Sequence, residues 1–293
     1  MTRAAGFVLA ALLSAACSGS SSTSPAPLPP APSAPAVLVG AGDIGDCATR
    51  GSQITAQLLD RIGGTVFTVG DNAYPSGTAE NFRDCYHPTW GRHRQRTRPS
   101  PGNHEYEAAG AAPYFQYFGG LAGQSGLGYY NYSLGAWRVF SLNSEVGIDA
   151  GSAQMAWLRS ELSGTTTLCT LAYFHRPLFS SGYHGDQIQM REMWRTLYEF
   201  GVDIVVSAHE HSYERFGPQD FTGRFDSARG IRQFIVGTGG TTLRTVGPAR
   251  PNSEVHGSSW GVLVLTLEDS RYRWEFVPAE PGGLQDAGIG LCH

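Results

Sequence analysis

The sequence predicts a single α/β domain, and three observations lead to this. Two short apolar strands at residues 37–39 and 65–69 flank a helical pattern, which is the arrangement of a β-α-β unit. Apolar strands and helical patterns then alternate further along the chain, with strands at 167–174 and 202–206 and helices at 153–162 and 187–200. The chain has 293 residues, of which 41% are hydrophobic, and this is enough for one sizeable core.

The predicted β-α-β unit delivers two aspartates to one edge of a sheet. Residues 52–61 are the expected helix, with Ser52 as its N-cap and apolar residues recurring at helical spacing. Asp43 follows the first strand and Asp71 the second, each directly after a glycine. A right-handed crossover pairs the strands in parallel and puts both carboxylates at the edge where α/β sheets bind ligands. An ordinary turn after each strand is the alternative.

Three later segments also end in residues that bind metals. The stretch before residue 105 carries Asn103, which offers an amide oxygen, and His104, which offers an imidazole. His175 follows the strand at 167–174, and His209 and His211 follow the strand at 202–206. Two histidines at this spacing in an extended chain point the same way. A lone histidine at a strand end is usually structural, but four strand ends together supply enough oxygen and imidazole donors for two metal ions.

The remaining segments complete the predicted domain. Residues 75–98 are expected to be a long irregular stretch, whose alternate arginines either steer an anionic substrate or belong to a solvated loop. An aromatic-rich insertion follows. We expect its aromatic side chains to pack under a long loop rather than to form a cage around a ligand. Strands at 130–134 and 137–142 form an expected hairpin, and strands at 231–236, 261–267 and 272–277 are expected to close a second sheet.

The first 17 residues have the pattern of a signal peptide. Arg3 precedes an apolar run over residues 4–13, and small residues follow up to Cys17. This run is too short to span a bilayer, which takes about 20 apolar residues. Cys17 before a Ser/Gly run resembles a bacterial lipoprotein start, in which the cysteine is lipidated, although Ser14 fills the usual place of the lipobox leucine. Plain secretion with cleavage after Ala16 is the alternative.

Both interpretations of the N-terminal sequence predict export, either as an envelope lipoprotein or as a secreted or periplasmic protein. A lipid on Cys17 would be the only membrane contact. Residues 18–36 are rich in Ser, Pro and Ala and are the expected tether, which leaves residues 37–293 as the globular domain.

Export decides how the other four cysteines are interpreted. In an oxidising compartment Cys47, Cys85, Cys169 and Cys292 most simply form two disulfides, which can be paired in three ways. The pairing of Cys47 with Cys85, both beyond a strand end that carries an aspartate, and of Cys169 with Cys292 is the favoured one. A cysteine metal site is the weaker alternative because no two cysteines have CxxC spacing.

Charge and composition exclude several classes of function. The net charge of −4 gives no electrostatic footprint for nucleic acid or an anionic membrane surface. All 21 basic residues are arginine, so a P-loop, a Schiff-base enzyme and a lysine general base are excluded. Proton transfer therefore falls to His, Asp, Glu, Tyr or a metal-bound water.

Five blocks in order resemble the calcineurin-like metallophosphoesterases, and they cover nearly the whole domain. These blocks are 42–45, 70–74, 102–105, His175 and 208–211. Within that family the similarity is closest to the purple acid phosphatase branch, because Tyr74 stands three residues after Asp71 and Gly45 stands where other members have a histidine ligand. Ala208 departs from the usual glycine of the last block, and the N-terminal domain of the large plant enzymes is absent. The resemblance implies a four-layer αββα sandwich with mixed sheets.

The resemblance also implies a pair of metal ions. One is expected to be held by Asp43, Tyr74 and His211 and the other by Asn103, His175 and His209, with Asp71 bridging both. Hard oxygen donors with imidazole suit iron, manganese or zinc. A tyrosine ligates well only as phenolate, so iron(III) at the Tyr74 site beside divalent Fe, Zn or Mn is the first choice.

The expected reaction is hydrolysis of phosphate monoesters of a small phosphorylated substrate, by attack of a hydroxide bound at the metal pair. His104 is expected to bind the phosphoryl oxygens and Glu105 to orient a ligand, with a solvated glutamate as the alternative. A histidine at the offset of His184 faces the substrate in purple acid phosphatases, and it would protonate the leaving group unless it is a solvated loop residue.

Two other functions stay open at this point. The same metals would serve a phosphodiesterase or nucleotide pyrophosphatase. An envelope protein that binds phosphate or a partner without catalysis is the third, although none of the seven expected ligands is missing.

Overall fold

The protein is described by a computed structural model covering residues 1–2, 4–11 and 34–293. Residues 1–2 and 4–11 belong to a first unit and contain neither helix nor strand, and all helices and strands of the described chain lie in residues 34–293. Cys17 and the predicted tether up to residue 33 lie outside the described residues. No helix in the described part of the chain combines the length and apolar character needed to cross a bilayer.

The domain contains two mixed sheets. The first has six strands in the order β13 (Asp286–Leu291), β12 (Arg271–Pro278), β11 (Gly261–Leu267), β1 (Ala36–Ala41), β2 (Thr65–Val69) and β3 (Thr97–Ser100). Its strands β1, β2 and β3 are parallel, and the others are antiparallel to their neighbours. Their carboxyl ends therefore meet at one edge.

The second sheet has seven strands. Their order is β10 (Ser253–Gly257), β8 (Tyr213–Phe216), β9 (Arg232–Val236), β7 (Ile204–Ser207), β6 (Cys169–Tyr173), β5 (Trp137–Ser141) and β4 (Tyr130–Leu134). The central strands β5, β6, β7 and β9 are parallel, which again collects carboxyl ends at one edge.

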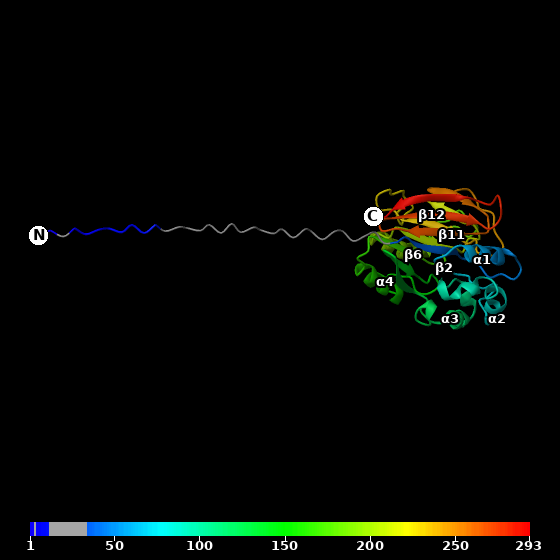
Figure 1. The fold of residues 1–293 in the computed structure, drawn as a ribbon. Coiled ribbons are helices and arrows are strands. Elements are labelled where there is room, and N and C mark those ends of the chain that lie inside the picture. Colours follow the sequence, from blue (N-terminus) through cyan, green and yellow to red (C-terminus); the bar gives the residue numbers. More distant parts are fainter. Residues whose placement is uncertain (3, 12–33) are drawn as a thin grey trace. The chain divides into compact units, whose positions relative to one another are not determined.

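Helices α1, α2, α3 and α4 lie beside and below the strands in the view of Figure 1. The α-helices are α1 (Gly51–Arg61), α2 (Ala79–Asn81), α3 (Ala112–Phe118), α4 (Ala153–Ser163) and α5 (Arg191–Glu199). Short 3₁₀ or π turns are η1 (Phe82–Tyr86), η2 (Trp90–Arg96), η3 (Glu105–Glu107), η4 (Ala109–Ala111), η5 (Gly119–Ala122) and η6 (Ile188–Met190).

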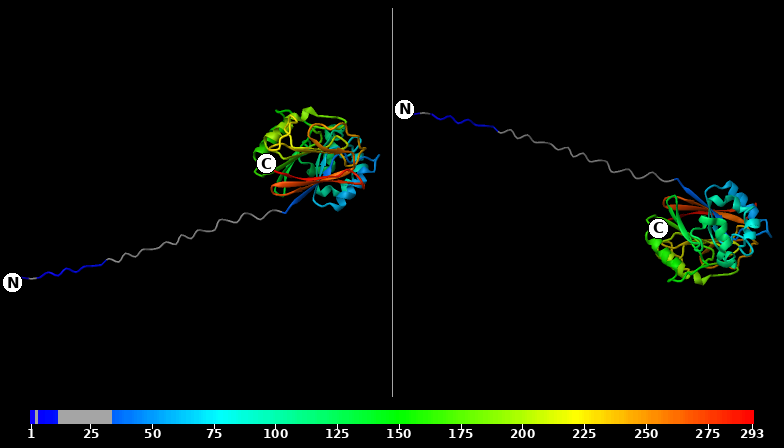
Figure 2. Two further views of the ribbon diagram at one scale, coloured as in Figure 1. Left: turned by 90° about the horizontal axis from the view of Figure 1, so that it is seen from above. Right: turned by 90° about the horizontal axis from the view of Figure 1, so that it is seen from below.

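Side chains of the seven-stranded sheet alternate between two apolar layers, as the period of a strand requires. Val139 and Leu171 point into the core that β1, β2, β11 and β12 share, whereas their neighbours Phe140 and Ala172 join a second core with α4 and α5. The two sheets therefore pack face to face, with α4 and α5 on the outer face of the seven-stranded sheet (Figure 2). This confirms the predicted α/β fold class with two mixed sheets.

Two expectations about the helices were wrong. Ser52 is not a cap, because α1 begins at Gly51 after Arg50, which makes no side-chain cap hydrogen bond. Residues 75–98 are not irregular, since α2, η1, η2 and the start of β3 occupy most of them. Their arginines bind other parts of this region: Arg92 pairs with Asp60, and Arg96 donates to the carbonyls of Gly64 and Leu59. They do not form one face toward a substrate.

The expected second sheet was only partly right. Strand β9 does join the seven-stranded sheet, but β11 and β12 extend the first sheet, because β11 pairs antiparallel with β1. Strands β3, β8, β10 and β13 were not predicted. Each is short or lies at or near a sheet edge, where the apolar pattern is weak.

Both favoured disulfides are present. Cys47 is bonded to Cys85 with a Cα–Cα distance of 5.0 Å, and Cys169 to Cys292 with a Cα–Cα distance of 5.3 Å. The first connects the loop after β1 to η1, and the second connects β6 to the C-terminal residues. The prediction of two disulfides and of their pairing is confirmed.

Candidate metal centre

All seven predicted ligands lie in loops that follow the carboxyl ends of parallel strands. Asp43 follows β1, Asp71 and Tyr74 follow β2, and Asn103 follows β3; from the other sheet, His175 follows β6, and His209 and His211 follow β7. Three of these residues have a left-handed backbone, with φ of 57° at Asp43, 49° at Asp71 and 69° at His209. Non-glycine residues adopt this conformation rarely and at a cost, and such strain is concentrated at functional sites.

Close packing of these loops depends on glycine. A Cβ atom at Gly102 would lie 2.3 Å from Oδ1 of Asp71, and one at Gly237 would lie 2.3 Å from Oδ2 of Asp43. At Gly42 a Cβ would lie 2.5 Å from the Cβ of Ala208. The alanine at position 208, where the family usually has glycine, therefore fits because Gly42, which follows a strand of the other sheet, has no Cβ to collide with it.

One group of predicted ligands gathers around the Tyr74 hydroxyl. This oxygen lies 2.7 Å from Oδ1 of Asp43, 3.1 Å from Oδ2 of Asp71 and 3.2 Å from Nε2 of His211. Nδ1 of His211 faces the carbonyl of Thr242 at 2.9 Å. That carbonyl only accepts, so Nδ1 carries the proton and Nε2 directs its lone pair at the tyrosine.

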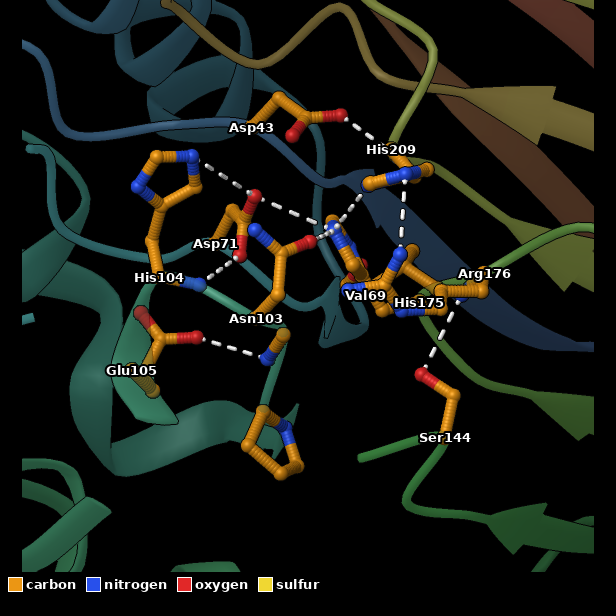
Figure 3. Close-up of polar contacts among 12 residues, drawn as sticks. Asp43, Val69, Asp71, Asn103, His104, Glu105, Ser144, His175, Arg176 and His209 are labelled. Atoms are coloured by element: carbon orange, nitrogen blue, oxygen red, sulfur yellow. Dashed lines mark hydrogen bonds and ion pairs between the residues drawn. The ribbon is translucent and has the colours of Figure 1, made fainter. Parts of the chain in front are cut away.

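A second group gathers around Nε2 of His175 (Figure 3). This atom lies 3.1 Å from both Oδ2 of Asp71 and Oδ1 of Asn103, and 3.2 Å from Nδ1 of His209. Nδ1 of His175 donates to the carbonyl of Val69 at 2.8 Å, so Nε2 is the ring nitrogen that faces the group and would offer its lone pair to a metal. Asp71 belongs to both groups, because its Oδ2 contacts Tyr74 and His175 alike.

Both groups fit a metal cation. Each brings carboxylate oxygens, an amide or phenol oxygen and imidazole nitrogens together, and one hydroxyl proton cannot serve the three acceptors around Tyr74. Asp71, His175 and His209 can offer ligand atoms that lie within 4.8 Å of one another, and all three are buried. Hard oxygen donors with borderline imidazole are the set that iron, zinc and manganese take.

The charges of the ligands favour a cation at the same place. Burial lowers the pKa of His175, but the carboxylate of Asp71 outweighs this and raises it to about 10. Burial and the neighbouring His175 instead lower the pKa of His209, so its ring is neutral, the form that binds metals. The cluster therefore holds one positive charge through a proton, and metal binding would replace it.

Glu105 lies behind the ligands and connects two of their loops. Its side chain is fully buried and accepts hydrogen bonds from the backbone N–H groups of Asn72 at 2.8 Å, Ala73 at 3.2 Å and Gly102 at 2.7 Å. These donors flank Asp71 and Asn103, so the structure excludes the alternative of a solvated glutamate. Burial and the charge of Asp71 raise the pKa of Glu105 to about 8.

His104 lies at the rim of the cluster. Its backbone N–H donates to Oδ1 of Asp71 at 2.9 Å, and its ring Nε2 lies 3.7 Å from Oδ2 of the same carboxylate. The ring packs on Tyr74 with centroids 4.5 Å apart and is 27% exposed. The imidazole is thus beside both ligand groups and reachable from solvent.

His184 lies against the predicted ligand His209. Its ring stacks on His209 with centroids 4.3 Å apart and planes 23° apart. The backbone N–H of His184 donates to Oε1 of Glu210 at 2.8 Å, and Nη1 of Arg244 lies 2.9 Å from Nε2 of the His184 ring. Burial and the charge of Arg244 lower the pKa of His184. The guanidinium thus lies over the ring, since Nη1 is also 3.4 Å from Nδ1 of His184, and the histidine is held against the candidate site.

Sequence reasoning missed three charged residues at the site. Arg176 pairs with Glu145 at 2.8 Å and brings Nη1 to 3.2 Å from Nε2 of His209. Glu210 is buried and stands between the predicted ligands His209 and His211 in the sequence. Arg244 comes from a loop distant in sequence. Arg176 and Glu210 are sequence neighbours of predicted ligands, and this adjacency could have identified them as candidate site residues. Nothing local to Arg244 indicates its position.

Comparison with known proteins gives the family. A family model described as calcineurin-like phosphoesterase matches residues 32–213. Among curated relatives, probable purple acid phosphatase 20 of Arabidopsis thaliana is 27% identical over 228 residues, which are 67% of this chain and 53% of that protein. Purple acid phosphatase 21 of the same plant is 28% identical over 80% of this chain and 58% of its own. The chain spans about half the length of these relatives.

Solved structures show the same fold. Purple acid phosphatase PPD1 from yellow lupin seeds superposes with a TM-score of 0.73 at 18% identity, over 88% of this chain and 54% of that one. GAP50, described as the anchor in the inner membrane complex of Plasmodium, superposes with a TM-score of 0.68 at 14% identity, over 88% and 89% of the two chains. Because the fold also occurs in an anchor protein, the activity has to be argued from the site.

Proposed function

Because the chain belongs to the calcineurin-like phosphoesterase family, we propose that it is a phosphatase with two metal ions that hydrolyses phosphate monoesters. The observation that carries this is the convergence of ligand atoms in two groups that share Asp71. One ion would be held by Asp43, Tyr74 and His211 and the other by Asn103, His175 and His209. When bound, the two ions would neutralise the charge of the substrate and supply an activated water near neutral pH.

The chemistry of Tyr74 supports iron(III) in the first position. Burial and the carboxylates of Asp43 and Asp71 raise the pKa of the phenol well above its usual value. Only a strongly acidic cation therefore stabilises its phenolate, and a trivalent ion does so better than a divalent one. The imidazole-rich group around His175 suits divalent Fe, Zn or Mn.

The surrounding residues would bind and orient the phosphoryl group. His104, beside Asp71 and partly exposed, would donate a hydrogen bond to a phosphoryl oxygen. Arg176, next to His209, would add positive charge on the side of the second group. His184, whose ring stacks on His209, would give a proton to a departing alkoxide.

Export of the enzyme is part of the proposal. Two disulfides are typical of proteins that fold in an oxidising compartment. We infer that residues 1–17 are a signal peptide with Cys17 as the lipidation site, that residues 18–36 are a tether, and that residues 37–293 are the catalytic domain.

A substrate panel tests the proposal. The purified protein, loaded with iron and zinc, is assayed on 4-nitrophenyl phosphate and on bis(4-nitrophenyl) phosphate, which share a leaving group and differ in ester class. We expect the monoester to have the larger kcat/KM. A preference for the diester would replace the phosphatase with a phosphodiesterase, and hydrolysis of neither by metal-loaded protein would favour a binding protein.

A further inference from the structure

Glu210 is a buried carboxylate that the proposed reaction leaves unused. It stands between the predicted ligands His209 and His211 in the sequence, and it is 1% exposed. Its Oε1 accepts from the backbone N–H of His184 at 2.8 Å. Its Oε2 is buried and has no hydrogen-bond partner among the residues that the structure describes. A buried polar atom without a partner costs free energy, so packing alone does not account for this oxygen.

The group that this oxygen faces is the imidazole of His184. Oε2 of Glu210 lies 3.4 Å from Nδ1 of the ring. The loop backbone also passes close to the carboxylate, since a Cβ atom at Gly182 would lie 2.4 Å from Oε2. A separation of 3.4 Å is longer than an ordinary hydrogen bond, but hydrogen bonds between catalytic groups are often long before substrate binds and tighten when it does. An Nδ1–H on this ring would give the free oxygen its missing partner.

Two contacts together would fix the His184 ring. Stacking on His209, with centroids 4.3 Å apart and planes 23° apart, fixes the plane of the ring. A hydrogen bond from Nδ1 to Glu210 would fix the rotation of the ring within that plane and leave Nε2 for the substrate. Arg244 contacts both ring nitrogens from over the ring, so it closes neither edge. The aspartate of the Ser-His-Asp triad holds its imidazole in one orientation and tautomer in the same way.

The loop that carries the histidine has other anchors. The N–H of Ser181 donates to Glu214 at 2.9 Å, and the Ser181 hydroxyl donates to the same buried carboxylate. Further along the loop, Asp186 forms an ion pair with Arg250 at 2.7 Å. These contacts hold the loop on both sides of the histidine. The effect of Glu210 on the imidazole can therefore be separated by experiment from its effect on the backbone.

We propose that Glu210 is a positioning residue, whose Oε2 accepts from Nδ1–H of His184 and so orients the ring to give the Nε2 proton to the leaving oxygen. This rests on the proposed phosphatase function and adds one residue to it. Glu210 acts through His184 and touches neither the substrate nor the reacting atoms. Its removal should therefore matter for substrates whose leaving group needs a proton.

Glu210→Gln tests this because it distinguishes the two carboxylate oxygens. The backbone N–H of His184 still needs an acceptor, so the amide oxygen takes the place of Oε1. The NH2 group then takes the place of Oε2, where it cannot accept from Nδ1–H. With metal content equal to that of the wild type, we expect kcat on ethyl phosphate to fall about tenfold or more, the effect of one charged hydrogen bond. On 4-nitrophenyl phosphate kcat should fall far less.

A second variant and a control accompany it. Glu210→Asp keeps the charge but withdraws it by one methylene, and it should show the same selective loss. Glu214→Gln is the matched control, because it changes a buried glutamate that binds the same loop through Ser181. Loosening the loop in this way should change kcat on both substrates by the same factor.

A double-mutant cycle measures whether Glu210 acts through the ring. In a His184→Ala background, Glu210→Gln should have no further effect on the hydrolysis of ethyl phosphate, because the imidazole that it orients is absent. A simple loss of stability or of loop structure would instead add to the effect of His184→Ala.

The outcomes separate this inference from the proposed function. Equal losses on the two substrates in Glu210→Gln, the same selective loss in Glu214→Gln, or additive effects in the cycle would each overturn the positioning role without affecting the phosphatase proposal. If His184→Ala itself causes no selective loss, the positioning role is also wrong. If the metal-loaded wild type hydrolyses neither ester, the proposed function fails and the positioning role fails with it.

Discussion

Asp71 is the residue on which both halves of the site depend. Its Oδ2 lies 3.1 Å from the Tyr74 hydroxyl and 3.1 Å from Nε2 of His175, and its Oδ1 accepts from the His104 N–H. Burial raises the pKa of this carboxyl, but His175 and His104 outweigh burial and hold it below its usual value. The side chain is therefore a charged, buried carboxylate shared by the two groups of predicted ligands.

Replacing this carboxylate should empty both metal positions. In Asp71→Asn the shared negative charge is lost, so we expect metal loss at both positions and a fall in kcat/KM beyond the 10–100-fold typical of residues that only support ligands. Elemental analysis with nitrophenyl phosphate assays measures both effects. Asn103→Ala is the matched control and should weaken chiefly one position. Full metal content and activity in Asp71→Asn would refute the two-metal assignment.

Tyr74 should give the protein a colour. A phenolate on iron(III) absorbs visible light by charge transfer, so the iron-loaded wild type should be coloured and Tyr74→Phe bleached, at equal iron content. Absorption spectra with parallel iron analysis measure this. If the active wild type is colourless and contains zinc or manganese only, iron(III) is wrong and the hydrolase assignment is unaffected.

His184 should matter most for poor leaving groups. Its ring stacks on the predicted ligand His209, and an alkoxide leaving group needs a proton whereas nitrophenolate does not. We expect His184→Ala to keep its metals, lose about 10²-fold or more on alkyl phosphates and lose much less on nitrophenyl phosphate. Equal losses on both substrates would make His184 a binding residue, and no loss on either would make it an ordinary loop residue.

At the scale of elements, the sequence predicted those with strong local patterns. The apolar run at Thr65–Val69 became β2 with the predicted bounds, and the strands before the predicted ligands on β1, β2, β6 and β7 were found because buried parallel strands are continuously apolar. Strand β3, which precedes Asn103, has no such run and was not predicted. Sheet partners could not be predicted in the same way. Strand β11 pairs with β1 across more than 200 residues, and no local signal in either segment specifies that partner.

The same limit applies to the site. Ligand positions followed from motifs, whereas Arg244 reaches His184 from 60 residues away through a loop with no regular pattern. The edge strand β13 was also missed, and a buried ion pair holds it. Asp286 accepts from Arg215 at 2.7 Å and from Tyr213 at 2.7 Å, which joins β13 to β8 of the other sheet.

Asp286→Asn should therefore destabilise the domain. Burial raises the pKa of Asp286, but hydrogen bonds from Arg215 and Tyr213 outweigh it and hold the pKa below its usual value. Loss of this charge leaves a buried guanidinium less compensated and should cost about 3 kcal/mol. Because the folded-state pKa is lowered, the difference from wild type should be full above about pH 4, the ordinary pKa of aspartate, and shrink as the pH falls further. Denaturant unfolding at pH 7 and pH 3 measures this, and an equal difference at both would contradict it.

At the scale of the whole molecule, the disulfides and the N-terminal sequence point to the same compartment. Both disulfides connect segments distant in sequence, with separations of 38 and 123 residues. Such bonds persist outside the cytoplasm.

Mass spectrometry of the protein purified from its native membrane fraction tests the predicted start. We expect a mature N-terminus at Cys17 carrying a diacylglyceryl group, because a cysteine after small residues is the lipobox pattern. A Cys17→Ser variant is the control and should be released into the soluble fraction. An unmodified Cys17 terminus would show plain secretion and leave the catalytic proposal untouched.

The central claim is that two metal ions at the Asp71 cluster carry out phosphate ester hydrolysis, and a metal titration tests it most directly. The protein is stripped with a chelator, metal is added back in steps, and bound metal per chain is measured together with the rate on nitrophenyl phosphate. The two ligand groups predict that activity rises to a plateau at two bound ions per chain and is nearly absent at one. Full activity at one ion or none, or two bound ions without hydrolysis, would contradict the claim.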